Sequence, residues 1–411
     1  DFAVVIPQEN SNEERDLKIQ LHSNEVKNIS QYHRSYDCLA YPLLFPHGEY
    51  GWHPQYKSLN TSHRSQVTVN QYYSYLFHFR RNSHIHRCGR LYLQYIVDAY
   101  ARVNQNNLKF IRDHQRQLRC EAYQPMTDAL INDISLTNIG RRIILPSSFV
   151  GSPRYMNQKY HDVMSIVAKF GKPSFFITFT CNPKWIEITR ELRNGEIANE
   201  RPDLTVRVFH EKIERFNNDL TNKHVLGEVT AYCEVIEFQK RGLPHQHGVY
   251  WLSNNDKVRN ADEYDSIVSA EIPDNDPLLM ETIASNMIHG PCGALNPNSP
   301  CMKNGKCTKH FPKAFNERTF VDSKGFVVYK RRDNGVTVPV RREHNQNFIV
   351  DNKWIVPYNR ALSRKYNAHI NVEIVKSTVQ SCKYLFKYQH KGSDKALIGI
   401  EQNDEIKQYL D

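Results

Sequence analysis

The sequence predicts a mixed α+β fold, because both helical periodicity and strand-like patterns occur along the chain. Apolar residues recur every three or four positions over 67–123, 155–170 and 206–220, which predicts helices. The apolar run 174–180 is bounded by prolines and indicates a buried strand. Two further strand patterns, 229–239 and 245–252, follow each other across the short segment 240–244, which predicts a hairpin.

A chain of 411 residues exceeds one ordinary domain, so we expect two or three lobes. The first spans residues 1–140. It begins with a polar, extended arm over 1–65, interrupted by the stretch YPLLFPHGEYGWHP, whose prolines exclude a long helix. A basic helical lobe follows, and its arginines, Arg87 and Arg102 among them, form either a solvated face or a DNA contact.

The second domain is expected to span residues 141–411. It includes an insertion over 285–345 that carries cysteines and histidines. Within it, Asp333-Asn334-Gly335 predicts a hairpin between strands 326–330 and 335–340. The segment 372–391 is interpreted as the last helix.

The overall charge suits a polyanionic partner without requiring one. Lys and Arg number 54 against 44 Asp and Glu, a formal charge of +10. The longest apolar runs are far shorter than the roughly 20 residues that a membrane span needs, so we expect no membrane partner. We also expect no secretory signal, since the first residues lack a basic segment followed by an apolar one. Nine scattered cysteines favour a reducing compartment and metal binding over disulfides.

The sharpest local pattern is GLPHQHGVYWL, in which His245 and His247 lie two apart on a predicted strand and share a face. Glu237 and Gln239 share a face of the preceding strand. Two imidazoles with one carboxylate or amide leave coordination positions open, as a catalytic metal requires. Two histidines on a strand can equally be exposed residues or satisfied core residues.

A second pattern lies near the end of the chain, in CKYLFKYQHKG. Tyr384 and Tyr388 are four residues apart, so on a helix both hydroxyls share one face, where they can serve as exchangeable nucleophiles. Interleaved basic residues favour phosphate contact at this helix: Lys383, Lys387 and Lys391. The alternative is ordinary packing of an aromatic pair.

A third pattern predicts a structural zinc site. Its expected ligands, in a loop rich in Gly, Pro and Asn, are Cys292, Cys301, Cys307 and His310. Reduced thiols without a metal are the alternative. The run around His84, His86 and Cys88 is interpreted as surface residues.

Several segments, in their order along the chain, resemble the nuclease domain of Helitron transposases, which belong to the HUH endonuclease superfamily. They are YPLLFPHGEYGW, RYMNQKYHDVMSIVAKFGKPSFFITFTCNPKW, RPDLTVRVF, EFQKRGLPHQHG and KYLFKY. The resemblance covers nearly the whole chain from about residue 40. It implies an HUH-type fold, in which a central antiparallel sheet is flanked by helices, the histidine strand lies centrally and the tyrosine helix packs across it.

The resemblance also implies roles for residues. His245 and His247 become ligands of Mg²⁺ or Mn²⁺, with Glu237 as third ligand and Gln239 as the runner-up. Tyr384 and Tyr388 become paired nucleophiles that form a 5'-phosphotyrosine. Arg241 joins the three lysines as a DNA contact. One departure is Gln246, since the residue between the histidines is usually hydrophobic, and this puts the packing behind the strand in doubt.

The implied activity is the nicking and rejoining of single-stranded DNA at transposon ends, with target DNA as the second substrate and a nuclear location. A helicase is expected in a C-terminal part of the full-length protein, because this sequence lacks a G-x-x-x-x-G-K-[ST] phosphate loop. Two other functions remain open. One is a sequence-specific DNA-binding module without catalysis that contains structural zinc, and the other is a hydrolase that activates water.

Overall fold

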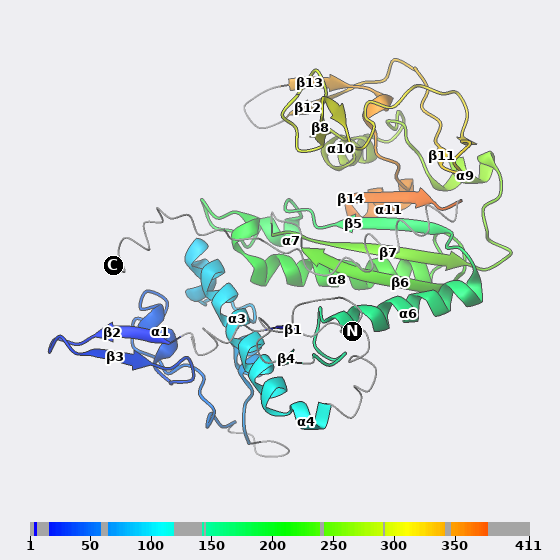
Figure 1. Ribbon diagram of the computed structural model, residues 1–411. Coiled ribbons are helices and arrows are strands. Elements are labelled where there is room, and N and C mark those ends of the chain that lie inside the picture. The colour runs from blue at the N-terminus through cyan, green and yellow to red at the C-terminus, as the bar shows by residue number, and fades with distance from the viewer. Residues whose placement is uncertain are drawn as a thin grey trace.

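The computed structural model describes residues 16–58, 65–118, 145–238, 242–290, 292–341 and 347–376, together with the short strands β1 (Val4–Val5) and β4 (Arg142–Ile143). Figure 1 shows a helical N-terminal part around α3, a four-stranded sheet with long helices beside it, and a lobe of short strands above the sheet. The expected α+β class with an antiparallel sheet is confirmed. The domain boundary expected at residue 140 lies outside the described residues.

The central sheet has four strands, in the spatial order β14 (His369–Ile374), β5 (Phe175–Thr180), β7 (Pro244–Leu252) and β6 (Val229–Phe238). Every pair of neighbours is antiparallel. β7 lies between β5 and β6 and is buried along its whole length. β6 contains one irregularity, because Val229 pairs with Leu252 while Ala231, rather than Thr230, pairs with Trp251.

Long helices pack on both faces of this sheet (Figure 1): α6 (Pro153–Phe170) and α8 (Pro202–Thr221). α6 begins where the side chain of Ser152 caps its first turn. Val163 of α6 packs with Trp251 on one face. Phe216 of α8 packs with Phe179 on the opposite face. The sequence predicted both helices, as well as β5, β6 and β7, to within a few residues.

The N-terminal part contains β2 (Leu17–Gln20), β3 (Val26–Ile29), α1 (Tyr36–Ala40), α2 (Val69–Leu76), the 3-10 turn η1 (Ile85–Arg87), α3 (Arg90–Asp113) and α4 (Gln115–Leu118). The interpretation of residues 1–65 as an extended arm is wrong for the aromatic stretch. Tyr41, Leu44 and Trp52 are buried in one core with Tyr73 and Tyr95. The prolines do prevent a long helix, but the aromatic side chains cover the apolar faces of α2 and α3.

A buried ion pair lies at the centre of this N-terminal part. Arg102 of α3 donates to the carboxylate of Asp37 at 2.5 Å, and also to the hydroxyl of Tyr73 and the carbonyl of Gln31. Both charged side chains are nearly inaccessible, at 4% and 2% exposure. Burial raises the pKa of Asp37, and Arg102 partly offsets that rise. Arg102 is therefore a structural residue, and neither a solvated face nor a DNA contact describes it.

Charged and polar side chains join the N-terminal part to α8 and to the segment before it, which contains α7 (Ile186–Thr189) and the 3-10 turn η4 (Ala198–Glu200). Arg87 lies 3.0 Å from the carboxylate of Glu196. His86 lies 3.8 Å from the carboxylate of Asp203 in the first turn of α8. The interpretation of His86 as a surface residue is wrong, because its ring is completely buried at this junction. Burial also lowers the pKa of His86.

The lobe above the sheet contains α9 (Ala261–Ile267), α10 (Pro277–Asn286), β8 (Met302–Lys303), β9 (Lys306–Cys307), β10 (Phe320–Val321), β11 (Val327–Val328), β12 (Val338–Arg341), β13 (Asn347–Val350) and the 3-10 turn η6 (Asn352–Trp354), with α11 (Arg360–Tyr366) leading back to the sheet. We call it the insertion lobe. It has a core of its own, which includes Ile283, Val340 and Trp354. None of the helices within the described ranges is both long and apolar enough to cross a membrane.

The hairpin expected at Asp333-Asn334-Gly335 is wrong. β11 pairs with β10, and β12 pairs with β13, so the two predicted strands are not partners. The Asn334 side chain instead accepts hydrogen bonds from the backbone of Val336 and from the side chain of Asn352, both at 3.2 Å. This side-chain-to-backbone turn connects two separate hairpins.

The insertion lobe covers the open edge of the central sheet. The outward N–H groups of Ile370, Val372 and Ile374 on β14 donate respectively to Met287 Sδ (3.2 Å), Pro357 O (3.1 Å) and Tyr329 Oη (2.8 Å). The outward N–H donors of β14, an edge strand, are thus satisfied without a further strand. The helix predicted over 372–391 is wrong at its start, because residues 372–374 belong to β14. Residues 377–391 lie outside the described part of the chain.

We expect Arg102→Met to lower the free energy of unfolding by about 3–5 kcal/mol, because Asp37 would keep a buried charge without its partner. The measurement is urea unfolding followed by tryptophan fluorescence. Arg112→Met on the same helix is the matched control, since its guanidinium is more than one-third exposed. Equal losses for the two variants would contradict a structural role for the Arg102–Asp37 pair.

Candidate metal centre

Two histidines and a glutamate meet on adjacent strands of the central sheet. His245 and His247 are two residues apart on β7, so their side chains share one face. Glu237 on β6 pairs with His245 across the ladder, which brings its carboxylate to the same face. Glu237 Oε2 lies 3.8 Å from His245 Nε2 and 3.6 Å from His247 Nε2. We call these three residues the sheet triad.

The sheet triad has the geometry of a group that could hold a metal ion. Its ligand atoms all lie within 4.8 Å of one another. Adjacent ligands of an octahedral ion with bonds of about 2.1 Å are about 3 Å apart. The contacts to Glu237 therefore need to shorten by less than about 1 Å. One carboxylate and two imidazoles would leave coordination positions for water or a substrate oxygen.

Thr178 on β5 orients one of the two imidazoles. Its Oγ1 lies 3.0 Å from His247 Nδ1, and the two residues are paired across the ladder. When Nδ1–H donates to Thr178, Nε2 carries the lone pair that a metal needs. The ring of Phe176 stacks on His247 at 5.8 Å between centroids. Sequence reasoning missed Thr178, although its place in the alternating run FFITFT put it on one face with Phe176.

The structure explains the unusual Gln246 between the histidines. Gln246 points to the opposite face of β7, where its Nε2 donates to Asn217 Oδ1 of α8 at 3.1 Å. Asn217 in turn donates to Glu234 at 2.8 Å, and Tyr250 Oη donates to the same carboxylate at 2.7 Å. The polar Gln246 side chain is thus part of a buried hydrogen-bond network, and the packing behind the strand is intact.

Gly248 makes that network possible. A Cβ at this position would lie only 2.5 Å from the Tyr250 ring, so only glycine lets the ring cross the strand toward Glu234. Burial raises the pKa of Glu234, and its hydrogen bonds from Tyr250, Asn217 and Gln246 partly reverse that rise. Both faces of β7 therefore carry polar side chains at the same point along the strand.

The face that carries the sheet triad is divided into two halves. α6 covers the apolar half, around Trp251 and Val249. In the other half the register places the polar residues Thr178, Thr180, His369 and Asn371 on the same face as the triad. The alternation of HINVEI in β14 is the signal that could have identified His369 and Asn371. This polar half is where a charged substrate can lie against the sheet.

The other sequence-predicted residues of this site lie outside the described part of the chain. They are the nucleophile candidates Tyr384 and Tyr388, the alternative ligand Gln239, and the proposed DNA contacts Lys383, Lys387, Lys391 and Arg241.

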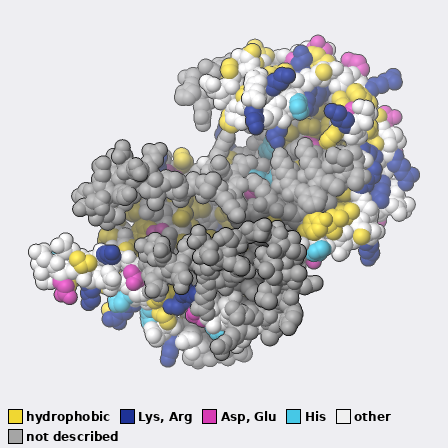
Figure 2. All heavy atoms as spheres, viewed as in Figure 1, with side chains coloured by type: hydrophobic (Ala, Val, Ile, Leu, Met, Phe, Trp, Pro, Cys, Tyr) yellow, Lys and Arg dark blue, Asp and Glu magenta, His cyan; other side chains and the backbone are white. Residues whose placement is uncertain are grey.

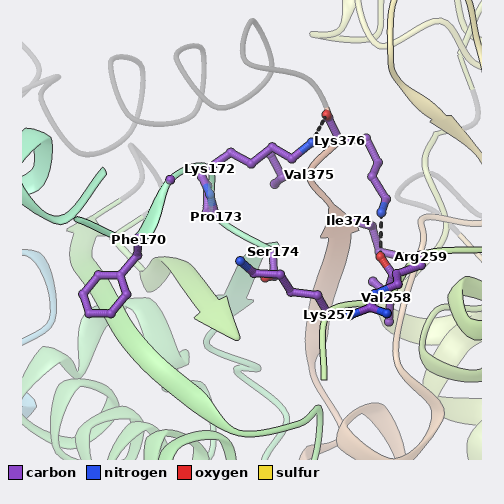
Figure 3. Close-up of a pocket in the computed structure, with 11 residues that line it drawn as sticks. Phe170, Lys172, Pro173, Ser174, Lys257, Val258, Arg259, Ile374, Val375 and Lys376 are labelled. Carbon is purple, nitrogen blue, oxygen red and sulfur yellow. Dashed lines mark hydrogen bonds between the residues drawn. The ribbon is translucent and has the colours of Figure 1, made fainter. Parts of the chain in front are cut away.

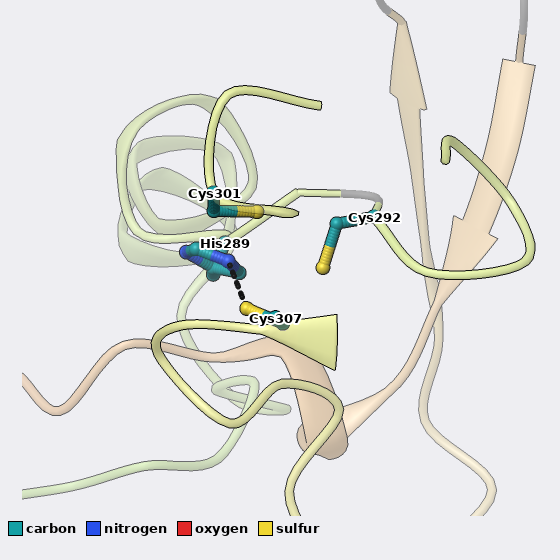
Figure 4. A group of neighbouring side chains, drawn as sticks. All are labelled: His289, Cys292, Cys301 and Cys307. Carbon is teal, nitrogen blue, oxygen red and sulfur yellow. Dashed lines mark hydrogen bonds between the residues drawn. The ribbon is translucent and has the colours of Figure 1, made fainter. Parts of the chain in front are cut away.

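A second group of metal-ligating side chains lies in the insertion lobe (Figure 4). It joins His289, Cys292, Cys301 and Cys307, whose ligand atoms also lie within 4.8 Å of one another. The choice of His310 as the histidine of this group is wrong. His310 is exposed, whereas His289 Nε2 lies 3.3 Å from the sulfur of Cys307. Each histidine lies three residues from a cysteine, His310 after Cys307 and His289 before Cys292, so the spacing alone does not distinguish them.

Figure 3 shows a pocket of about 400 Å³. The strand register places it at the opposite end of the sheet from the sheet triad. Four of its eleven lining residues are cationic, and none is a histidine, cysteine, aspartate or glutamate: the cationic ones are Lys172, Lys257, Arg259 and Lys376. Two of these lysines already donate to backbone carbonyls in the wall. This pocket suits an anion and has no metal ligand of its own.

Comparison with known families supports a Helitron-related chain. The family model described as the Helitron helicase-like domain at the N-terminus matches residues 72–250. The matched range is somewhat less than half of the 411 residues, and it contains β5, β6, β7 except its last two residues, and all three residues of the sheet triad. No curated protein matches the chain.

We expect Tyr250→Phe to lower the free energy of unfolding by about 1–3 kcal/mol at neutral pH, because buried Glu234 loses a donor. The folded-state pKa of Glu234 is raised, so the cost of its buried charge is present above that pKa and disappears as the pH falls and the carboxyl is protonated. The difference between variant and parent should therefore shrink at a pH of about 4. Urea unfolding at both pH values measures it.

Tyr232→Phe is the control for this variant, since that tyrosine is half exposed on β6. If Tyr250→Phe lowers the free energy of unfolding equally at both pH values, an ionised Glu234 is not the hydrogen-bond partner of Tyr250.

Proposed function

We propose that this chain is the DNA-nicking domain of a Helitron-type rolling-circle transposase of the HUH class. The family match supports a transposase-related role. The finer assignment rests on one observation, the convergence of Glu237, His245 and His247 at the polar half of one sheet face. The proposed reaction is cleavage of single-stranded DNA with formation of a 5'-phosphotyrosine, followed by rejoining of strands.

The sheet triad would bind Mg²⁺ or Mn²⁺, which supplies positive charge that polarises the scissile phosphate. Glu237 favours these hard ions because a carboxylate is a better ligand for them than an amide. Thr178 positions His247. On the opposite face, Gln246 holds the histidine strand through its hydrogen bond to Asn217 of α8. These residues therefore contribute a preorganised site for an anionic substrate.

The proposed nucleophiles are Tyr384 and Tyr388. One phenol loses its proton and its oxygen attacks the phosphorus; the bond from phosphorus to the 3' oxygen breaks, and that oxygen takes up a proton. The products are a 5'-phosphotyrosine and a free 3'-hydroxyl. The covalent link keeps the energy of the broken ester, so the second tyrosine can serve a later transfer step.

The chain length between the strand and the tyrosines is compatible with this reaction. β14 ends at Ile374, ten residues before Tyr384. Ten residues span about 15 Å in a helix and up to about 33 Å when extended. Ile374 pairs with Phe175, which lies on β5 only three residues from Thr178. A tyrosine at position 384 can therefore reach the sheet triad.

One segment of the insertion lobe is rich in cations that a nucleic-acid partner could contact. Residues 302–341 contain ten Lys and Arg against three Asp and Glu, and Arg331 among the ten is buried, whereas residues 261–301 of the same lobe contain seven Asp and Glu and no Lys or Arg. Figure 2 shows Lys and Arg side chains spread over this lobe. Lysines and arginines on a surface neutralise phosphates and release counterions. We propose transposon-end and target DNA as partners, a helicase in the rest of the full-length protein, and a nuclear location.

We expect the double variant Tyr384→Phe, Tyr388→Phe to form no covalent adduct with end-labelled single-stranded DNA in Mn²⁺, whereas the parent forms one that survives SDS. The reason is that phenylalanine has no oxygen to attack phosphorus. Tyr100→Phe, which removes an exposed hydroxyl on α3, should leave the adduct unchanged.

Two results would overturn the proposed reaction. DNA retention by the parent without any adduct would indicate a binding module. Cleavage by the double variant at the parental rate, with no protein on the DNA, would indicate a hydrolase that activates water.

We expect Thr178→Val, which removes the side chain that orients His247, to weaken Mn²⁺ binding about 10-fold to 100-fold. His247→Ala removes a ligand itself, so it should weaken Mn²⁺ binding by at least about 100-fold. Isothermal titration calorimetry measures both affinities. His210→Ala, which removes an exposed histidine on α8, is the control. Unchanged Mn²⁺ affinity in His247→Ala would exclude the sheet triad as the metal site.

A further inference from the structure

The β8–β9 hairpin in the insertion lobe presents two cysteines at its open end. Asn304 and Gly305 form its turn, and both have positive φ, at 52° and 73°. Two such residues in succession are characteristic of a type I′ turn, which matches the twist of a tight hairpin. Met302 pairs with Cys307, so Cys301 and Cys307 lie side by side where the two strands begin and end.

The other two members of the group come from the chain just after α10. The backbone N–H of His289 donates to Trp354 O at 2.9 Å, which anchors this segment to the lobe core. Gly290 follows with φ of 92°, and a Cβ there would lie 2.8 Å from Cys292 N and 3.0 Å from the Trp354 ring. Only glycine therefore allows the tight turn that brings Cys292 toward the hairpin.

We propose that His289 Nε2 and the sulfurs of Cys292, Cys301 and Cys307 bind one structural zinc ion. Three sulfurs and one imidazole form a closed tetrahedral set of the kind that zinc prefers. Sulfur ligands of tetrahedral zinc are about 3.8 Å apart, and the ligand atoms here already lie within 4.8 Å. Figure 4 shows the four side chains directed at a common centre.

Two contacts around the group suit a metal site. The backbone N–H of Lys309 donates to Cys307 Sγ at 3.3 Å, an outer hydrogen bond that stabilises a thiolate ligand. The ring of Phe311 stacks on His289 at 4.3 Å, which fixes the plane of the imidazole. A disulfide would use two sulfurs and leave the third cysteine and the histidine without a common role.

The zinc would connect the insertion lobe to the edge of the central sheet. Cys292 and Cys307 belong to the lobe core, and of the four residues of β8 and β9 only Cys307 is buried. Met287, two residues before His289, accepts the N–H of Ile370 on β14 through its sulfur. Asn286 O contacts His369 Nδ1 at 2.8 Å. A metal that orders this segment therefore also stabilises the contacts that cover the β14 edge.

The first test uses the purified parent chain, so it does not depend on any variant folding. We expect one zinc per chain by elemental mass spectrometry, and an X-ray absorption spectrum that fits three sulfur ligands and one nitrogen ligand. Absence of zinc after reconstitution with Zn²⁺ under reducing conditions, or a shell without sulfur, would overturn the proposal.

Variants then identify the histidine. His289→Ala should lose most of the zinc, His289→Cys should retain it with four sulfur ligands, and His310→Ala should retain the parental content. Cys88→Ser is the matched control for Cys301→Ser, because both cysteines are partly exposed and only Cys301 belongs to the group. Retention of zinc in His289→Ala with loss in His310→Ala would overturn the ligand set.

Hydrogen exchange tests the structural consequence. Removal of zinc by a chelator should accelerate exchange at the Ile370 and Val372 amides, while amides between β5 and β7 keep their protection. Unchanged protection at both β14 amides would exclude a role for the ion in covering the edge. None of these readouts involves DNA, so their failure is distinguishable from failure of the proposed nuclease activity.

Discussion

The pairing of β6 with β7 is the constraint on which the candidate metal centre depends. Because Glu237 lies opposite His245, one antiparallel register brings a carboxylate and two imidazoles to the same face. A slip by one residue would send Glu237 to the other face. That face is already occupied at this level by the hydrogen-bond network of Gln246 and Glu234. Polar partners on both sides of the strand thus specify a single register.

Apolar periodicity was enough to predict the frame around this site. The run FFITFT and the segment PHQHGVYWL are continuous strands, and the helices on either side repeat every three to four residues. The two-residue spacing of His245 and His247 placed both on one face without further information. Short-range patterns of this kind depend only on the geometry of one element or of two adjacent ones.

Features that depend on distant contacts could not be predicted in the same way. β14 is only six residues long, and its hydrogen-bond partners are β5 on one side and the insertion lobe on the other. His289 joins three cysteines through a fold that the local spacing of Cys307 and His310 does not reveal. Burial of Tyr41 and Trp52 depends likewise on α2 and α3, which come later in the chain.

The bulge near the start of β6 determines which residues of that strand face the metal centre. Thr230 is the extra residue, so every position that follows is shifted by one relative to β7. With a regular ladder continued from Val229, Ile236 would lie opposite His245 and the carboxylate would face α8. The inserted residue therefore sets the phase of the whole strand, and a deletion seven residues before Glu237 could remove a ligand from the centre while every strand of the sheet stayed in place.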